Sequence, residues 1–238
     1  MKNIVCTLAA LLALAHMPPA AAQASCSSDG TAPPSAVFER FISADCEVCW
    51  SDAAAPAPST AGGALVLDWI VPAPAGDDAP LSAAATPESL ARLRTLGRAA
   101  PTTTDVFISP VLGAPTARIR VAHGLPFNDY IGAALSFAPA RAPQGRAAEP
   151  GNFGLYLVLV ESVPAGADGT AVARNVVRAV YEAPWNPGDA PTAVAPRQWK
   201  EARSMHIPDG TRPGRLAVVG WVHDAHGHVL AAAQSVCR

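Results

Sequence analysis

Residues 41–52 read F-I-S-A-D-C-E-V-C-W-S-D and place Cys46 and Cys49 directly after a segment of strand composition. Residues 50–55 can form a turn or two of helix before Pro56 stops it. A C-x-x-C pair at the start of a helix favours thiol chemistry. The helix N-terminus stabilises the thiolate of the first, exposed cysteine, and the second lies close enough to resolve a mixed disulfide.

No metal and no cofactor are expected from the motifs of the chain. A zinc site built on C-x-x-C normally needs a second pair of ligands at similar spacing, and the sequence has none. It also has no P-loop and no dinucleotide-binding fingerprint. The two cysteines are therefore interpreted as a thiol pair rather than as half of a metal site.

The segments around the motif predict an α/β fold. Thr86-Pro87-Glu88 is a typical helix start for residues 86–97, and the apolar spacing of residues 128–137 predicts a second helix. Strands are expected at 36–43, 64–71, 104–109 and 117–122, the last two forming a pair joined through residues 110–115. This order of elements is that of a thioredoxin-like domain, which we place at residues 36–138.

The pattern changes after a linker rich in Pro, Ala, Arg and Gly at residues 139–150. A continuous apolar run at 155–160 predicts a central strand, and residues 172–181 fit either a strand or a helix. Further strands are expected at 203–207, 216–223 and 228–235, with a turn at residues 224–227 joining the last two. Residues 151–238 are therefore predicted to form a β-rich antiparallel extension.

Residues 1–24 have the three parts of an export signal peptide. Lys2 supplies the positive charge, residues 4–17 form a short apolar run, and Ala22-Gln23-Ala24 fits the cleavage site. We therefore expect a periplasmic or secreted bacterial protein. The mature chain has no apolar run of about 18 residues, so no membrane span is expected. The formal net charge of −2 argues against a nucleic-acid partner.

Export leaves the mature chain with the cysteines Cys26, Cys46, Cys49 and Cys237, which allow three pairings. Disulfides persist in oxidising compartments outside the cytosol. Cys46 and Cys49 are close enough for a local bridge, which leaves Cys26 with Cys237 at the two ends of the mature chain. Because domain termini often lie near each other, we expect both the Cys46–Cys49 and the Cys26–Cys237 disulfides.

The stretch around the C-x-x-C pair resembles the F-T-S-x-G-C-x-x-C-P-x-A-D motif of a family of exported bacterial proteins of unknown function. Those proteins look like a thioredoxin-like domain followed by a β-rich extension. Short segments continue the resemblance in the same order over residues 36–236: R-A-A-P at 98–101, V-F-I at 106–108, N-V-V-R at 175–178 and V-V-G-W-V-H-D at 218–224.

This chain departs from the family pattern at the motif itself, where Trp50 stands in place of proline. The family's H-V-D-Y-W-D stretch is matched only by L-D-W-I-V at 67–71, without the histidine. In thioredoxin-like folds a cis-proline lies beside the C-x-x-C pair. The resemblance implies Pro101 as this proline and Pro110 as the reserve.

The leading functional hypothesis is thiol–disulfide redox chemistry on other exported proteins, with Cys46 attacking and Cys49 resolving. Asp45 and Glu47 flank Cys46, and two carboxylates disfavour a thiolate beside them, which argues against a strong oxidant. The alternative is a non-catalytic binding or envelope protein in which the Cys46–Cys49 disulfide is a structural staple.

Four histidines are further candidate site residues. His223, His226 and His228 fall in the expected turn around Asp224 and could pinch a metal ion, but a polar hairpin tip is the simpler interpretation. His123 ends an expected strand and is interpreted as a surface residue rather than an acid–base catalyst.

Overall fold

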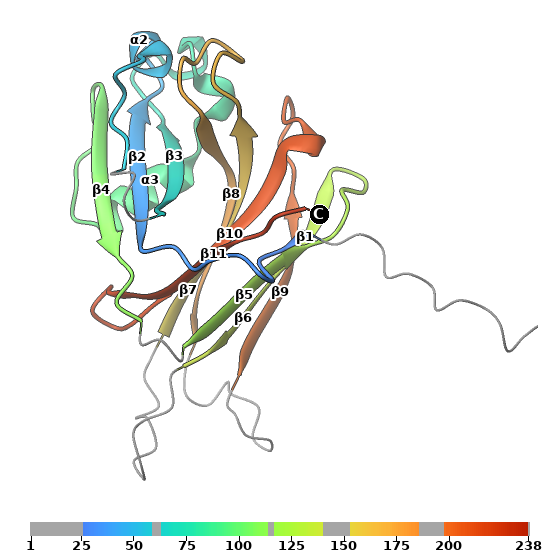
Figure 1. Ribbon diagram of the computed structural model, residues 1–238. Helices are drawn as coiled ribbons and strands as arrows, with labels where there is room; N and C mark the ends of the chain where they lie inside the picture. The colour runs from blue at the N-terminus through green and yellow to red at the C-terminus, as the bar shows by residue number, and fades with distance from the viewer. Residues whose placement is uncertain (1–25, 59–62, 114–116, 140–152, 186–197, 238) are drawn as a thin grey trace, which may run out of the picture.

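The computed structural model describes residues 26–58, 63–113, 117–139, 153–185 and 198–237. Strands make up 49% of the structure and helices 13%, and the strands form two sheets (Figure 1). The predicted α/β thioredoxin-like fold is therefore wrong. The expected signal peptide and residues 140–150 of the expected linker lie outside the described residues.

The larger sheet has seven strands in the order β11-β10-β7-β8-β3-β2-β4. Strand β3 runs parallel to both β2 and β8, and the other neighbours are antiparallel. The bounds are β2 (Ala36–Ser43), β3 (Leu65–Val71), β4 (Thr104–Pro110), β7 (Phe153–Val163), β8 (Arg174–Trp185), β10 (Leu216–His223) and β11 (Val229–Gln234).

The smaller sheet has four antiparallel strands in the order β1-β5-β6-β9. These are β1 (Cys26–Ser27), β5 (Arg118–His123), β6 (Tyr130–Ala138) and β9 (Trp199–His206). Both sheets thus combine strands from residues 36–138 with strands from residues 151–238. The helices are α2 (Glu47–Ser51) and α3 (Pro87–Thr95), with 3-10 turns η1 (Gly76–Asp78), η2 (Ser82–Ala84) and η4 (Pro213–Arg215).

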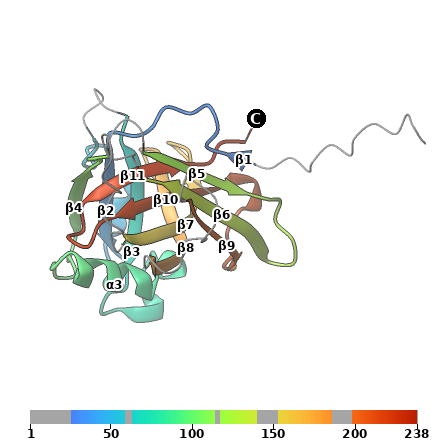
Figure 2. The same ribbon diagram turned by 90° about the horizontal axis from the view of Figure 1, so that it is seen from below.

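Strand β7 is buried on both faces, which explains why residues 155–160 form a continuous apolar run. Side chains alternate across a strand. Leu155, Leu157 and Leu159 accordingly join the core shared with the four-stranded sheet, whereas Tyr156 and Val158 join the core that includes Leu93 of α3. Figure 2 shows α3 against the part of the large sheet formed by β2 and β3.

Residues 130–138 form strand β6, so the helix predicted at 128–137 is wrong. Burial alternates along this segment, with Ile131, Ala133, Leu135 and Phe137 inside. The apolar residues fit both the helical and the strand periodicity. Pairing with β5 on one side and with β9 on the other selects the strand. The preceding turn holds two residues with positive φ, at 128 and 129, which helical residues do not adopt.

The other expected elements are largely confirmed. Strands β2, β3 and β7, helix α3 and the β10–β11 hairpin lie where the sequence predicts them, and residues 174–185 are a strand. The exception is the expected pair at 104–109 and 117–122, because β4 pairs with β2 whereas β5 pairs with β1 and β6. In the described part of the chain, no helix has the length and apolar character needed to cross a bilayer.

Tyr156 in this core predicts a specific response to alkaline pH. Its ring stacks on Trp221 with centroids 4.5 Å apart, and burial raises its pKa to about 12, although the Arg92 guanidinium near its ring opposes the rise. An unfolded tyrosine ionises near pH 10. Between about pH 10 and 12 the unfolded chain therefore releases a proton that the folded chain retains, and stability falls as the pH rises.

An alkaline titration of phenolate absorbance measures this directly. We expect one of the three tyrosines to ionise only near pH 12, and this late step to be missing in Tyr156→Phe. Circular dichroism on the same samples separates ionisation in the folded state from unfolding. A late step of equal size in Tyr156→Phe would contradict the assignment.

Candidate functional site

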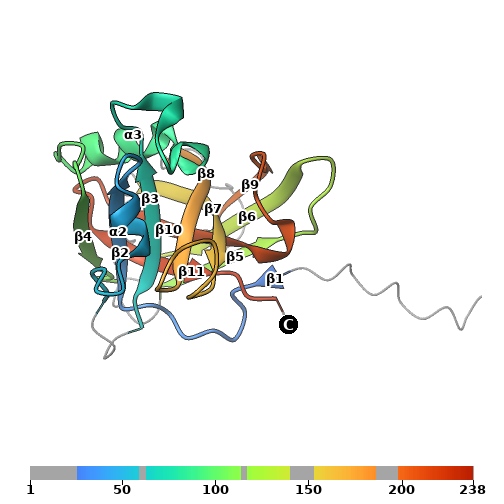
Figure 3. The ribbon, with the colours of Figure 1, turned by 90° about the horizontal axis from the view of Figure 1, so that it is seen from above.

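The Cys46–Cys49 disulfide is present and follows the carboxyl end of β2, which runs parallel to β3. Figure 3 shows helix α2, which contains Cys49, beside β2 and β3. Strand β2 ends at Ser43, and Cys46 is the N-cap residue of the five-residue helix α2. Ala44, in the connection between them, makes hydrogen bonds with both its amide and its carbonyl group. The Ala44 amide donates to the Val71 carbonyl oxygen (2.8 Å), and the Ala44 carbonyl accepts from the Leu81 amide (3.1 Å).

The two cysteines differ in exposure, in the opposite sense from the sequence expectation. Cys46 is only 7% exposed, whereas Cys49 is half-buried and packs beside the cluster that contains Ile42 and Ile70. Between them, Val48 is 75% exposed. A molecule approaching the disulfide from solvent therefore meets Val48 and Cys49 before Cys46.

Arg174 holds the end of helix α2. Its Nη2 donates to the carbonyl oxygens of Cys49 (3.1 Å) and Trp50 (2.9 Å), and its Nε donates to Thr170 Oγ1 (3.1 Å). The last carbonyls of a helix have no partner within the helix. A fully buried guanidinium therefore supplies hydrogen bonds that such a short helix cannot make for itself.

Asp68 balances the charge of this guanidinium. Its carboxylate accepts from Arg174 Nη1 (3.3 Å), from Arg40 Nε (2.7 Å) and Nη2 (3.1 Å), and from the amide of Asn175 (2.8 Å). Burial lowers the pKa of Arg174, and Asp68 opposes that effect. The network joins β2, β3 and β8 to the helix that carries the cysteines.

Sequence reasoning missed this network, although a signal for it was present. Arg40 lies within the strand A-V-F-E-R-F-I-S, and Asp68 within A-L-V-L-D-W-I-V. Charged residues are almost never fully buried unless they are paired. A charge inside each of two consecutive buried strands therefore indicates that the two charges face each other, as they do in the β2–β3 register.

Trp50 anchors the other side of the helix, which gives a structural role to the residue that departs from the family pattern. Its indole N–H donates to the Asp168 carbonyl oxygen (2.8 Å) in the loop between β7 and β8. The Arg215 and Arg212 guanidiniums hold the pKa of the Asp168 carboxyl below its usual range. Helix α2 is thus tied to segments far from it in sequence.

The two candidate prolines lie at opposite ends of β2. Pro101 is two residues before Thr103, whose carbonyl accepts from the amide of Ser43, so this segment reaches the cysteine end of the sheet. Pro110 pairs with Ala36 at the start of the strand. A strand of this length spans roughly 23 Å, so the reserve candidate is not beside the disulfide.

The three histidines of the β10–β11 hairpin do not form a three-ligand cluster within the described residues. The Nδ1 atom of His223 lies 2.9 Å from the Asp224 carbonyl oxygen, and Nδ1 of His228 lies 3.1 Å from the Asp224 carboxylate. His223 and His228 do line a cavity of about 350 Å³ that Arg92 also lines. The side chains of His223 and His228 thus contact Asp224 within the turn.

His123 is not the surface residue that its place at a strand end indicated. It is 6% exposed and lies beside the second disulfide, Cys26–Cys237, whose Cα atoms are 4.2 Å apart. Both disulfides expected from the cysteine count are therefore present.

The chain matches no family model, no curated protein and no solved structure. The motif resemblance to exported proteins stays a hypothesis.

Proposed function

We propose that this chain is an exported thiol–disulfide exchange protein and that Cys46–Cys49 is its reactive disulfide. The observation that carries the proposal is the contrast between the two disulfides. Cys46 and Cys49 are three positions apart, whereas Cys26 and Cys237 are 211 positions apart. Loop-closure entropy gives about 2 kcal/mol of stabilisation for the short bridge and about 5 kcal/mol for the long one. The short bridge stabilises the fold little, which favours a chemical role for it.

The exposure of the two cysteines supports an order of events. An incoming thiolate attacks the Cys49 sulfur, forms a mixed disulfide and releases Cys46 as a thiolate. The second thiolate of the same substrate then attacks the substrate sulfur of this mixed disulfide. A disulfide forms within the substrate, and Cys49 leaves as a thiolate. These steps are reversible: forward, they pass two electrons and two protons from a substrate dithiol to the protein pair; in reverse, the reduced pair attacks a substrate disulfide through Cys49 and reduces it as Cys46 and Cys49 form their disulfide again. This order reverses the roles expected from the sequence, because Cys46 is the buried partner.

The surroundings of the pair support exchange with a protein rather than with a small molecule. Val48 offers an exposed apolar contact, and the exposed acidic residues Asp45, Glu47 and Asp52 are its neighbours in sequence. These charges disfavour a thiolate and so stabilise the disulfide. We therefore expect a reduction potential nearer about −270 mV than about −120 mV, as in thiol pairs that reduce or reshuffle disulfides.

Equilibration of the full chain with thiol buffers of stepped potential, followed by acid quenching and alkylation, tests the proposal. Trypsin places both reactive cysteines on the peptide 41–92, whereas Cys26 and Cys237 fall on other peptides, so each disulfide is read separately. We expect reversible titration of the short pair while the long disulfide stays closed, and faster alkylation of Cys49 than of Cys46.

Activity on scrambled ribonuclease completes the test. After the short pair has been reduced in a thiol buffer, the wild type is expected to reactivate this substrate, Cys49→Ser to lose the activity, and Cys46→Ser to accumulate a mixed disulfide through Cys49. A potential below about −300 mV together with no reactivation of the substrate would reject the proposal.

The burial of Cys46 favours a second candidate, a non-catalytic binding or envelope protein with a structural disulfide at this position. This candidate predicts that Cys46→Ser only lowers stability and that both cysteines label slowly after mild reduction. The alkylation rates therefore separate the two candidates.

A further inference from the structure

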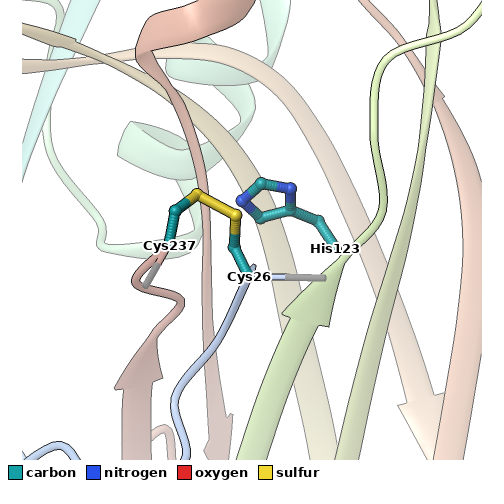
Figure 4. Close-up of side chains that lie close together, drawn as sticks. All are labelled: Cys26, His123 and Cys237. Atoms are coloured by element: carbon teal, nitrogen blue, oxygen red, sulfur yellow. A yellow bond between two sulfur atoms is a disulfide. The ribbon is translucent and has the colours of Figure 1, made fainter. Parts of the chain in front are cut away.

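Cys26, His123 and Cys237 form a cluster in which the two sulfur atoms and an imidazole nitrogen all lie within 4.8 Å of one another. Figure 4 shows one ring nitrogen of His123 turned toward the disulfide and the other turned away from it. Two cysteines and a histidine are ligands that zinc prefers. We call this group the terminal cluster, since Cys26 and Cys237 lie near the two ends of the described chain.

The protonation of His123 suits a metal ligand. Its Nδ1 lies 2.9 Å from the carbonyl oxygen of Gly124. A carbonyl oxygen only accepts, so Nδ1 carries the proton, and the lone pair of the neutral ring is on Nε2. Metal-binding histidines use this arrangement, in which a backbone carbonyl fixes the tautomer and the other nitrogen faces the ion.

Nε2 of His123 is buried and has no hydrogen-bond partner among the described residues. The residue is 6% exposed, so the nitrogen is not satisfied by bulk water either. Leaving a buried polar atom unpaired costs about 1–3 kcal/mol, and such atoms call for an explanation. An ion bound between Nε2 and the two sulfurs would provide one.

Backbone hydrogen bonds hold the cluster together without help from the disulfide. Cys26 lies opposite His123 in the β1–β5 register. Ser27, next to Cys26, exchanges two hydrogen bonds with Val236, next to Cys237, at 3.1 and 3.0 Å. Opening the S–S bond therefore leaves three ligands in place, and only side-chain rotation is needed to separate the two sulfurs.

We propose that, when the Cys26–Cys237 disulfide is reduced, the terminal cluster binds one Zn²⁺ ion through Cys26 Sγ, Cys237 Sγ and His123 Nε2. An external dithiol reduces the S–S bond to two thiols and is itself oxidised to a disulfide. Binding of Zn²⁺ then displaces the two thiol protons, and the fourth position of the tetrahedron is open to water. Because a sulfur in a disulfide cannot serve as a thiolate ligand, oxidation and zinc binding exclude each other.

The ligand set selects the class of metal. Two thiolates and an imidazole suit Zn²⁺, and the cluster contains no carboxylate of the kind that Ca²⁺ or Mg²⁺ requires. Cys237 is exposed whereas Cys26 and His123 are buried, so reductant and metal reach the cluster from the side of Cys237.

The test uses the full chain carrying Cys46→Ala and Cys49→Ala, which removes the other thiol pair from metal binding. This background also makes the result independent of the redox function proposed above. The protein is reduced with a phosphine under anaerobic conditions and titrated with Co²⁺ as a spectroscopic stand-in, then with Zn²⁺ against a chromophoric chelator. We expect one equivalent of metal with thiolate-to-cobalt absorption when reduced, and no binding when oxidised.

His123→Ala is the decisive variant, and His206→Ala, on the same sheet outside the cluster, is the matched control. Loss of groups that merely support a ligand weakens metal binding about 10–100-fold, so loss of His123 itself should weaken it at least tenfold. His206→Ala should bind as tightly as the background protein.

Three outcomes would overturn the proposal. The first is absence of thiolate-to-cobalt absorption in the reduced protein, and the second is equal affinity in His123→Ala. The third outcome applies if the reduced chain does not stay folded. Zn²⁺ should then restore a cooperative unfolding transition, as it does at metal sites coupled to folding. A reduced chain that stays unfolded with Zn²⁺ would contradict the proposed site.

Discussion

Replacing Asp68 by asparagine is expected to destabilise the protein by about 3–5 kcal/mol, the cost of breaking a buried ion pair from one side. Asparagine keeps the shape of the side chain, so packing is preserved and the change tests the charge. The side chains of Arg40 and Arg174 are 3% and 0% exposed, and both would lose their buried carboxylate partner. The asparagine NH₂ would also face a guanidinium, where a donor meets a donor.

Urea unfolding followed by circular dichroism measures the effect. Asp105→Asn is the matched control, because Asp105 pairs with Arg98 in a partly exposed position where such pairs contribute about 0–1 kcal/mol. A loss in Asp68→Asn no larger than in the control would mean that the buried network does not stabilise the fold.

The same variant has an expected consequence at the disulfide. Arg174 binds the carbonyls of Cys49 and Trp50, so a displaced guanidinium loosens helix α2. We expect faster alkylation of the reduced pair in Asp68→Asn than in the wild type, under conditions where both remain folded. An unchanged alkylation rate would show that the Asp68–Arg174 network does not control access to the cysteines.

Removal of the long disulfide is expected to lower stability by about 2–5 kcal/mol, the range found for native disulfides in small secreted domains. The bridge joins residues 211 positions apart and therefore restricts the unfolded chain far more than the short bridge does. Alanine replaces both cysteines in this variant, since serine would bury a hydroxyl at Cys26, which is 7% exposed. At roughly 2–4 °C per kcal/mol for a chain of this size, the melting temperature should fall by several degrees or more.

The double variant Cys46→Ala, Cys49→Ala is the internal comparison, with an expected loss of about 2 kcal/mol or less. Thermal unfolding of both variants in the same buffer, without added metal, ranks the two bridges. If removal of the short bridge costs as much as removal of the long one, the short bridge is a structural staple, and the argument for its redox role fails.

Much of the local structure could be predicted from the sequence because local patterns decide it. The alternation in residues 36–43 and the apolar runs at 64–71 and 155–160 became β2, β3 and β7, and the Thr-Pro-Glu start became α3. The prediction failed where two periods fit the same residues. At 128–137 the apolar positions suit a helix or a strand, and hydrogen bonding to β5 on one side and β9 on the other decides for the strand.

The sequence by itself indicated the covalent framework, since the four cysteines that follow the expected signal peptide, and their spacing, pointed to the two disulfides that the structure contains. Only the tertiary structure decided which groups surround them. His123 reaches the long disulfide because β1 pairs with β5, and Arg174 reaches α2 because β8 runs beside β3. Pairing between distant strands depends on the burial of the whole sheet, and no window of sequence around residues 41–52 contains that information.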